Sequence, residues 1–222
     1  MKTAIYFTLC LLFVFNLLKA QTPDNTKPHY GNVVKSQEYI DSDNEFIDIV
    51  VKQYGSREIA AKEHIKFGWD YLKKGDKETA MKRFNQAWLL DSTLSDVNWG
   101  YGAVLGANGQ FDQSIYYLKK YYDSNPQNNR ILIDIATAYF QYANSLKQQG
   151  MNDAWILNIG KGKSCIKKSL LINDKNAYAY SQLAIAYYYE NKIDSAKYYG
   201  LIANELDPKV LHPQFKKAVG ID

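Results

Sequence analysis

The segment 160–164, with the sequence GKGKS, contains the residue types that hold phosphate groups in nucleotide-binding loops. Such a loop also needs a glycine five residues before Gly162 and a strand ahead of it, so that backbone N–H groups converge on the phosphate. Leu157 stands at that position, and the surrounding pattern is helical. The segment therefore predicts a solvated basic helix face, with a weak anion or acidic-partner patch as the alternative. The lysines of this face are Lys161, Lys163, Lys167 and Lys168.

The remaining candidates for catalysis or metal binding do not form a site. The three histidines, His29, His64 and His212, lie far apart in the sequence and have no ligand spacing. His64 falls at a helix-packing position, which favours a buried core histidine. No CxxC, HExxH, EF-hand or GxSxG arrangement occurs. We therefore expect no catalytic residues, no metal site, no cofactor and no enzyme activity.

The first twenty residues differ from the rest of the chain. Lys2 is followed by an apolar run over 4–18 that contains no acidic residue, and the segment ends at Ala20. This pattern predicts a secretory signal peptide over 1–20, because the run is shorter than the roughly 20 residues of a membrane-spanning helix. The chain is then exported, either periplasmic or secreted, with no stable membrane insertion after cleavage. An uncleaved segment that anchors the chain in a membrane is the alternative.

The net charge and the cysteine content exclude some kinds of partner and of covalent cross-link. Without residues 1–20 the chain has 25 basic and 23 acidic residues, a formal charge of +2, because Lys2 and Lys19 are lost. A nucleic-acid surface needs a larger, clustered excess, so no nucleic-acid partner is expected. The same cut leaves Cys165 as the one cysteine, which excludes an internal disulfide. Its apolar helical surroundings favour a buried, inert thiol over a pairing with another chain.

A self-similar pattern begins near residue 68. Its template is Gly68-x2-Tyr71 followed by Ala80-x3-Phe84. Small residues at a fixed period mark places where paired helices touch, and each pair must bury its apolar face against the next. The pattern therefore predicts stacked helical hairpins. Later matches at a period of 34 residues are Gly102, Ala136 and Pro126, the last of which corresponds to Ser92.

The last copy of the pattern starts out of register. Ala184 follows Ala136 by 48 residues, a surplus of 14 over the period. The turn at Gly150 divides this surplus into seven residues before it and seven after it. Seven residues are about two helical turns, so both helices of the third hairpin lengthen and keep the same faces toward their neighbours. The third hairpin should project by about 10 Å. The four expected inter-helix turn residues are Gly75, Gly109, Gly150 and Asn191.

With these motifs at this period, the chain resembles the tetratricopeptide repeat (TPR) family over about residues 61–210. The resemblance implies an all-α fold, an α-solenoid of about four antiparallel helix hairpins. The repeats lie near 61–94, 95–128, 129–176 and 177–210. The tryptophan that opens the family pattern is absent from every copy, which weakens individual copies but not the array. The residues at that position are His64, Asn98, Leu132 and Tyr180.

The two ends of the array need covers. Ser42-x2-Glu45 predicts the start of a helix that ends at Gly55, in an N-terminal capping region over 35–60. The stretch from Pro213 to Val219 predicts a short closing helix in a C-terminal cap over 211–222. Residues 21–34 contain two prolines and many polar residues, which is typical of a flexible linker.

The TPR resemblance implies that the first helix of each repeat lines a groove for a protein or peptide partner. In this chain that stripe is aromatic and apolar, as interface centres are. Ile65 and Trp69 stand where the best-known family grooves clamp a terminal carboxylate, so we expect an extended or helical apolar segment instead. Packing between adjacent helices is the alternative for each ring. The predicted groove residues are Trp69, Trp99, Arg130, Phe140, Tyr178, Tyr188 and Tyr189, on a stripe that also includes Leu72, Ala103, Ile133, Thr137, Ser181 and Ile185.

The third hairpin offers a second predicted contact surface, because Trp155 and Ile156 lie in an apolar stretch of the projecting part. Such a surface would serve a partner or self-association. Together the patterns predict an exported TPR scaffold for protein–protein interaction, in the assembly or regulation of a cell-envelope complex. The alternative is a small-ligand or glycan-binding protein with aromatic stacking platforms. Sugar sites pair such platforms with clustered Asn, Asp or Gln residues, and the stripe has few of them.

Overall fold

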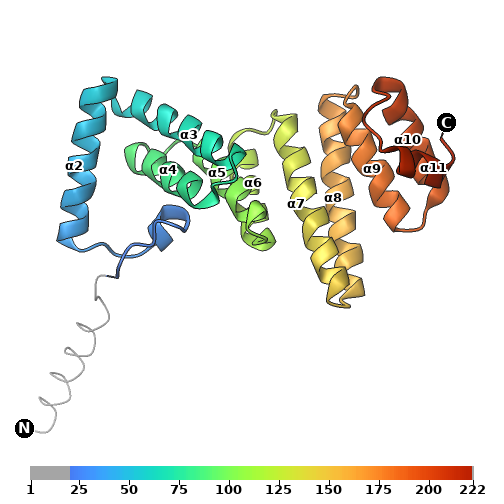
Figure 1. Cartoon of the computed structure of the whole chain (residues 1–222), viewed down its shortest axis with the longest axis horizontal. Coiled ribbons are helices and arrows are strands. Elements are labelled where there is room, and N and C mark those ends of the chain that lie inside the picture. The colour runs from blue at the N-terminus through green and yellow to red at the C-terminus, as the bar shows by residue number, and fades with distance from the viewer. Residues whose placement is uncertain (1–20, 222) are drawn as a thin grey trace, which may run out of the picture. The chain divides into compact units, whose positions relative to one another are not determined.

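The structure is a computed structural model that describes residues 21–221 (Figure 1). This part of the chain is all-helical, and its α-helices follow one another as antiparallel hairpins, as the sequence predicts. The predicted signal peptide over 1–20 lies outside the described residues. The elements are η2 (Pro28–Gly31), α2 (Gln37–Tyr54), α3 (Arg57–Lys73), α4 (Lys77–Leu90), α5 (Asp96–Ala107), α6 (Phe111–Ser124), α7 (Asn129–Gln148), α8 (Asn152–Ile172), α9 (Ala177–Tyr189), α10 (Ile193–Leu206) and α11 (Pro213–Val219).

The chain divides between Gly100 and Tyr101 into two compact units, and the division falls within α5. The first unit holds η2, α2 and the α3–α4 hairpin. The second holds α6, the α7–α8 and α9–α10 hairpins and α11. Within residues 21–221, none of the helices combines the length and the apolar character that a membrane crossing requires.

The turn inside each hairpin has the backbone conformation that the sequence predicts. Gly75, Gly109 and Gly150 have φ angles of 82°, 77° and 75°, and Asn191 has a φ of 59°. This left-handed conformation ends a helix and brings Cβ close to a carbonyl oxygen. It therefore favours glycine, which has no Cβ, and asparagine, whose short polar side chain can hydrogen-bond locally. The four residues therefore set where each first helix stops.

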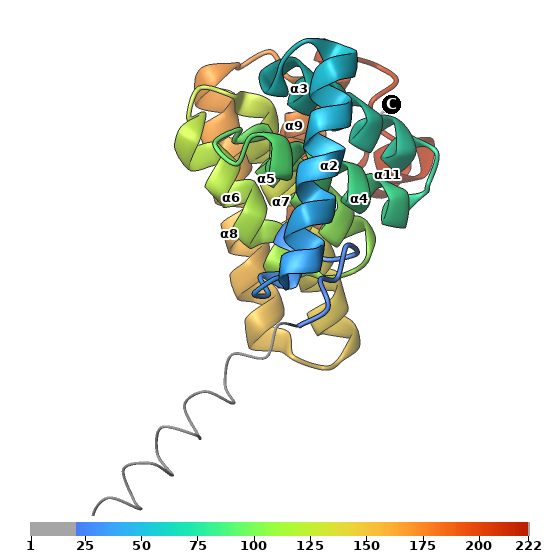
Figure 2. The ribbon, with the colours of Figure 1, turned by 90° about the vertical axis from the view of Figure 1, so that its left-hand side faces the viewer.

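The third hairpin has the predicted surplus length. Its first helix, α7, has 20 residues where α9 has 13. Its second helix, α8, has 21 residues where α10 has 14. Both helices therefore gain seven residues, and their shared end extends past α9 and α10 (Figures 1 and 2).

Aromatic side chains packed against glycine set the spacing of the helices in the first unit. Phe84 is fully buried between α3 and α5. A Cβ built on Gly68 would lie 2.5 Å from its ring, and a Cβ built on Gly100 would lie 2.4 Å from it. Neither helix could approach this closely with an alanine at the contact. The recurring small residue of the sequence pattern is therefore a packing requirement.

Both ends of the described chain carry a covering helix. On α2, Val50 is buried with Ala60 and Ala61 of α3, so α2 covers the first hairpin as expected. The predicted start of this helix at Ser42 is wrong, because α2 begins at Gln37 and Ser42 lies within it. The Ser42 hydroxyl donates to the carbonyl oxygen of Glu38 at 3.1 Å. At the other end, the predicted helix from Pro213 to Val219 is confirmed as α11.

Residues 21–34 differ from the expected flexible linker, because they pack against α4 (Figures 1 and 2, blue). The side chain of Asn85 is fully buried and donates to the carbonyl oxygens of Asn25, at 3.1 Å, and Lys27, at 2.8 Å. Tyr30 is buried, and the Lys35 ammonium lies 3.7 Å from its ring centroid. Tertiary contacts thus order a segment that has no helical pattern of its own.

The same segment holds its backbone in an unfavourable conformation. His29, Tyr30 and Asn32 have φ angles of 52°, 56° and 56°. A non-glycine residue in this region costs about 1–2 kcal/mol. The burial of Tyr30 and the hydrogen bonds from Asn85 offset that cost, so the turn depends on α4 for its stability.

Replacing Asn85 with leucine should release this segment. The substitution keeps the number and branching of the side-chain heavy atoms but leaves the carbonyl oxygens of Asn25 and Lys27 without their buried donor, at a cost of about 1–3 kcal/mol. Hydrogen exchange at residues 24–32 should speed up, and the melting temperature should fall. The control is Asn144→Leu, because that side chain is exposed. Unchanged exchange in the Asn85 variant would contradict this account.

Candidate functional site

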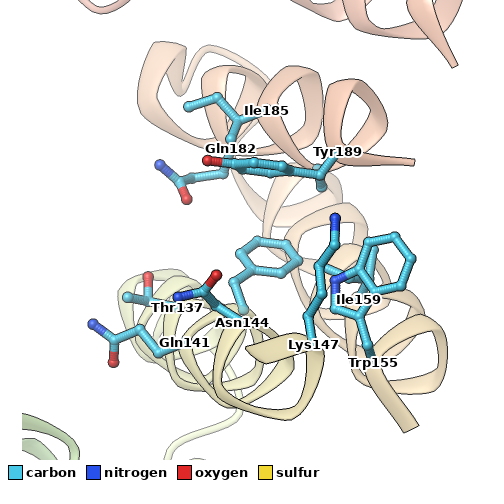
Figure 3. A pocket seen from close by; sticks show the side chains of 11 residues that line it. Thr137, Gln141, Asn144, Lys147, Trp155, Ile159, Gln182, Ile185 and Tyr189 are labelled. Atoms are coloured by element: carbon cyan, nitrogen blue, oxygen red, sulfur yellow. The ribbon is translucent and has the colours of Figure 1, made fainter. Parts of the chain in front are cut away.

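A pocket of about 490 Å³ lies where α7, α8 and α9 meet in the second unit (Figure 3). It combines three aromatic rings with several polar side chains, and among the described residues Lys147 is the one charged side chain of its lining. The lining residues are Thr137, Phe140, Gln141, Asn144 and Lys147 of α7, Trp155 and Ile159 of α8, and Gln182, Ile185, Ala186 and Tyr189 of α9.

The extra length of the third hairpin forms one wall of this pocket. Relative to the fourth repeat, α7 continues for seven residues beyond the end of α9 at Tyr189. Asn144 and Lys147 lie in this continuation, and Trp155 lies in the matching part of α8. A hairpin of the usual length would lack these three side chains and leave the end of α9 without an opposing wall.

Small residues bring the three helices close together under the pocket. Ala143, Ile159 and Ala186 form a buried cluster, one residue from each helix. Phe140 and Trp155 pack against this cluster and remain half-buried. The two rings therefore serve both the core and the pocket surface.

The pocket has a polar side and an apolar side. Figure 3 shows Thr137, Gln141 and Gln182 gathered on one side, with Trp155 and Ile159 on the other. The side-chain amides of Gln141, Asn144 and Gln182 make no hydrogen bond to another residue in the part of the chain that the structure describes. Each amide offers two donor hydrogens and an acceptor oxygen, so together they form an unused hydrogen-bonding surface.

A cation lies at the apolar side of the pocket. The ammonium nitrogen of Lys147 is 4.4 Å from the ring centroid of Trp155. This distance is within the range of a favourable cation–π contact, which holds the lysine stem against the indole.

A largely buried ion pair holds the end of α9 beside the pocket. Lys163 of α8 donates to both carboxylate oxygens of Glu190, at 2.7 and 2.6 Å, and its ammonium lies 4.3 Å from the ring centroid of Tyr187. The two charged side chains are only 13% and 10% exposed. Glu190 directly follows Tyr189, so the pair holds the stretch of backbone that carries the Tyr189 ring.

This ion pair corrects the interpretation of the 160–164 segment. Lys163 was expected on a solvated basic face, but the fold turns it inward toward Glu190. Lys161, Lys167 and Lys168 are exposed, as that interpretation requires. Gly162 is buried against Phe140, so the glycine serves helix packing and not a phosphate.

The structure brings together residues that the sequence assigned to two separate surfaces. The pocket is lined by two residues of the predicted groove, Phe140 and Tyr189, and by one residue of the predicted projecting surface, Trp155. Thr137 and Ile185 of the predicted stripe line it as well. One site therefore replaces part of each predicted surface.

The other predicted groove residues lie elsewhere. In the first unit, Trp69 packs edge-on against Trp99, with ring centroids 5.6 Å apart, and both are half-buried. In the second unit, the ring of Tyr188 packs edge-on against that of Phe215 of α11, with ring centroids 5.6 Å apart. These three rings make the inter-helix contacts that the sequence left as the alternative. Arg130 and Tyr178 are exposed but do not line the pocket.

The outer side of the hairpin tip exposes large apolar side chains. Ile156 is 53% exposed and Leu157 is 58% exposed, close to the α7–α8 turn. Met151, at the N-terminal end of α8, is 49% exposed. The projecting part therefore has more apolar surface than its own hairpin covers, with Trp155 turned inward and Ile156 turned outward.

His64 and Cys165, which could in principle be reactive, lie in environments that favour a structural role. His64 is buried, and its Nδ1 atom lies 2.8 Å from the carbonyl oxygen of Ala60. Burial lowers the pKa of this imidazole, which favours the neutral form. Burial also raises the pKa of the Cys165 thiol, as expected for an inert cysteine. No group of three or more His, Cys, Asp and Glu side chains suited to a metal ion occurs in residues 21–221.

Comparison with known proteins supports the hairpin architecture. No family model matches the sequence, and no curated protein matches it significantly. Among solved structures, TTC0263, a TPR protein of Thermus thermophilus, superposes with a TM-score of 0.59 at 14% identity. That match covers 72% of this chain and 79% of the other. The chain has the tetratricopeptide repeat fold. A crystal structure of MamA is also similar, with a TM-score of 0.52 at 20% identity over 73% of this chain and 85% of the other.

Within this TPR fold, the pocket uses residues that the repeat pattern did not indicate. Gln141, Asn144, Lys147 and Gln182 were missed because the groove prediction followed one stripe of the first helices. Gln141 and Asn144 follow Thr137 by four and seven residues on α7, which is the spacing of one helix face. Following this face of α7 from Thr137 into the surplus turns would have found both amides, Gln141 just before those turns and Asn144 within them.

Replacing Gly162 with alanine should destabilise the protein. Its new Cβ would lie 2.3 Å from the Phe140 ring, which forces the ring to move at a cost of about 1–3 kcal/mol. Gly160 lies two residues away on α8 and has open space around it. Gly160→Ala should therefore raise stability by up to about 1 kcal/mol through helix propensity. Denaturant unfolding measures both variants, and changes of the same sign would contradict the packing account.

Replacing Glu190 with glutamine should also destabilise the protein. The change leaves the largely buried Lys163 ammonium without a counter-charge, at a cost of about 2–4 kcal/mol. Lys192 lies 3.3 Å from the same carboxylate but is 59% exposed, so Lys192→Gln should cost less than about 1 kcal/mol. If urea unfolding shows that both variants lose the same free energy of unfolding, the Lys163–Glu190 pair does not stabilise the protein more than an exposed ion pair does.

Proposed function

We propose that this protein is a non-enzymatic scaffold that binds a protein partner through the tip of its long third hairpin. The observation that supports this proposal is the exposure of Met151, Ile156 and Leu157 at that tip. Apolar groups gathered at a projecting end gain free energy when a partner removes them from water. The TPR fold itself is one that presents helix surfaces to other proteins.

The rigidity of the hairpin supports the same proposal. α7 and α8 pack along their length, and Trp155 joins the tip to the buried Ala143–Ile159–Ala186 cluster. A tip that is already ordered loses little conformational entropy when a partner binds. The partner surface that fits it is an apolar groove or helix face.

We further propose that the chain is exported and acts in the assembly or regulation of a cell-envelope complex. The support for this step is the sequence of residues 1–20, with a basic start, an apolar run and a small residue at its end. Membrane anchoring by an uncleaved segment is the competing arrangement. N-terminal sequencing of the protein from fractionated host cells distinguishes the two, because a chain that starts at Gln21 excludes the anchor.

The partner proposal is tested at Ile156 and Leu157. A photo-crosslinking residue at position 157 should capture a protein in the host, and the affinity of the purified pair can then be measured. The double variant Ile156→Ser/Leu157→Ser should weaken that affinity at least about ten-fold, because two exposed apolar contacts are lost. Its melting temperature should stay unchanged, because both side chains already face solvent.

The matched control for this test is Leu171→Ser. Leu171 lies on the same helix, is 89% exposed, and stands at the opposite end from the tip. It should leave the affinity unchanged. Equal weakening by the control, or no weakening by the double variant, would refute the tip as the contact site. Capture of a second copy of this chain would identify the tip as a self-association surface.

A further inference from the structure

The pocket between α7, α8 and α9 combines two features that a sugar ring requires. A pyranose has C–H groups on its faces and hydroxyl groups around its rim. Its faces pack against aromatic rings, and each hydroxyl both donates and accepts a hydrogen bond. Here the rings are Phe140, Trp155 and Tyr189. The groups that can donate and accept are the amides of Gln141, Asn144 and Gln182.

We propose that this pocket binds an oligosaccharide, by one or two of its sugar rings. This activity is separate from protein binding at the hairpin tip and does not depend on it. The volume of about 490 Å³ lies within the size range of small-molecule sites. Figure 3 shows polar side chains on one side of the pocket and Trp155 with Ile159 on the other, which matches a ligand with an apolar face and a hydroxylated edge.

The strongest support for a sugar site is that the amides of Gln141, Asn144 and Gln182 have no hydrogen-bond partner within the described chain. These amides come from two helices that face the same pocket. An amide whose role is structural would pair with a neighbouring backbone or side chain, as Asn158 does with the carbonyl oxygen of Ala154 at 2.8 Å. Gln141, Asn144 and Gln182 are therefore available to a ligand.

The charge of the lining agrees with a carbohydrate. Within residues 21–221, no carboxylate lines the pocket, which disfavours cationic ligands. Glu190, next to Tyr189, is already paired with Lys163 and Lys192. The Lys147 ammonium can donate to a sugar hydroxyl or to the carboxylate of a uronic acid without leaving the Trp155 ring.

An extended peptide fits the same lining less well. A peptide presents its hydrogen-bonding groups along a line and needs a groove that continues past a single pocket. The polar groups here lie on one side of a single depression between α7 and α9. The aromatic residues also lie at that depression, whereas Trp69 and Trp99 of the expected groove pack against each other.

The test uses an array of neutral and uronic-acid oligosaccharides as the probe, followed by calorimetry with the best-bound sugar. The purified protein should bind saturably. Gln141→Leu should weaken binding roughly three- to ten-fold through the loss of one or two hydrogen bonds. Tyr189→Ala should weaken it by a similar factor through the loss of the ring face. Both side chains are exposed, so neither melting temperature should change.

The matched control is Gln148→Leu, the same substitution at an exposed α7 glutamine that does not line the pocket. It should leave sugar affinity unchanged. Three outcomes overturn the proposal: no sugar on the array binds, Gln141→Leu binds as the unmodified protein does, or Gln148→Leu weakens binding equally. Selection of a peptide from a random library that contacts Gln141 and excludes sugar would also overturn it. None of these outcomes affects the tip, whose test depends on Leu157.

Discussion

Close contact between a large side chain and a glycine is the constraint on which the other features depend. Phe84 packs against Gly68 and Gly100, Leu118 against Gly102, and Phe140 against Gly162. At each contact the missing Cβ lets one helix lie against the side chain of another. Interiors are close-packed, so these contacts fix the spacing of the helices. The four left-handed turn residues then set where each first helix ends, and the two constraints together define a hairpin.

The stretched hairpin shows how these constraints permit a new site. An insertion of seven residues in each helix is close to two turns, so the faces that touch α9 keep their contacts. The added turns have no counterpart in α9 and α10, and their side chains are released from repeat packing. Asn144, Lys147 and Trp155 come from these turns. The pocket and the exposed tip therefore share one origin, an in-phase lengthening that leaves the core unchanged.

Much of the fold follows from periodicity, because the period is a direct record of helix packing. The repeat positions, the turn residues and the length of the third hairpin were all predictable from the spacing of small residues. The N-terminal segment was not, because the hydrogen bonds that hold it come from the buried side chain of Asn85, about 60 residues further along the chain. The inward turn of Lys163 also depends on a distant residue, Glu190. Contacts between distant polar residues leave no local pattern.

The candidate site was predictable only in part, for a related reason. Aromatic residues at helical spacing look the same in sequence whether they pack between helices, as Trp69 and Trp99 do, or line a cavity, as Phe140 and Tyr189 do. What distinguishes the two cases is the polar residues beside the rings. The sequence stripe lacked the amide cluster that a sugar site needs, but the folded chain supplies it from Gln141, Asn144 and Gln182, next to the stripe. One amide from the additional turns and two from the repeat itself thus change an aromatic packing surface into one that can also bind hydroxyl groups.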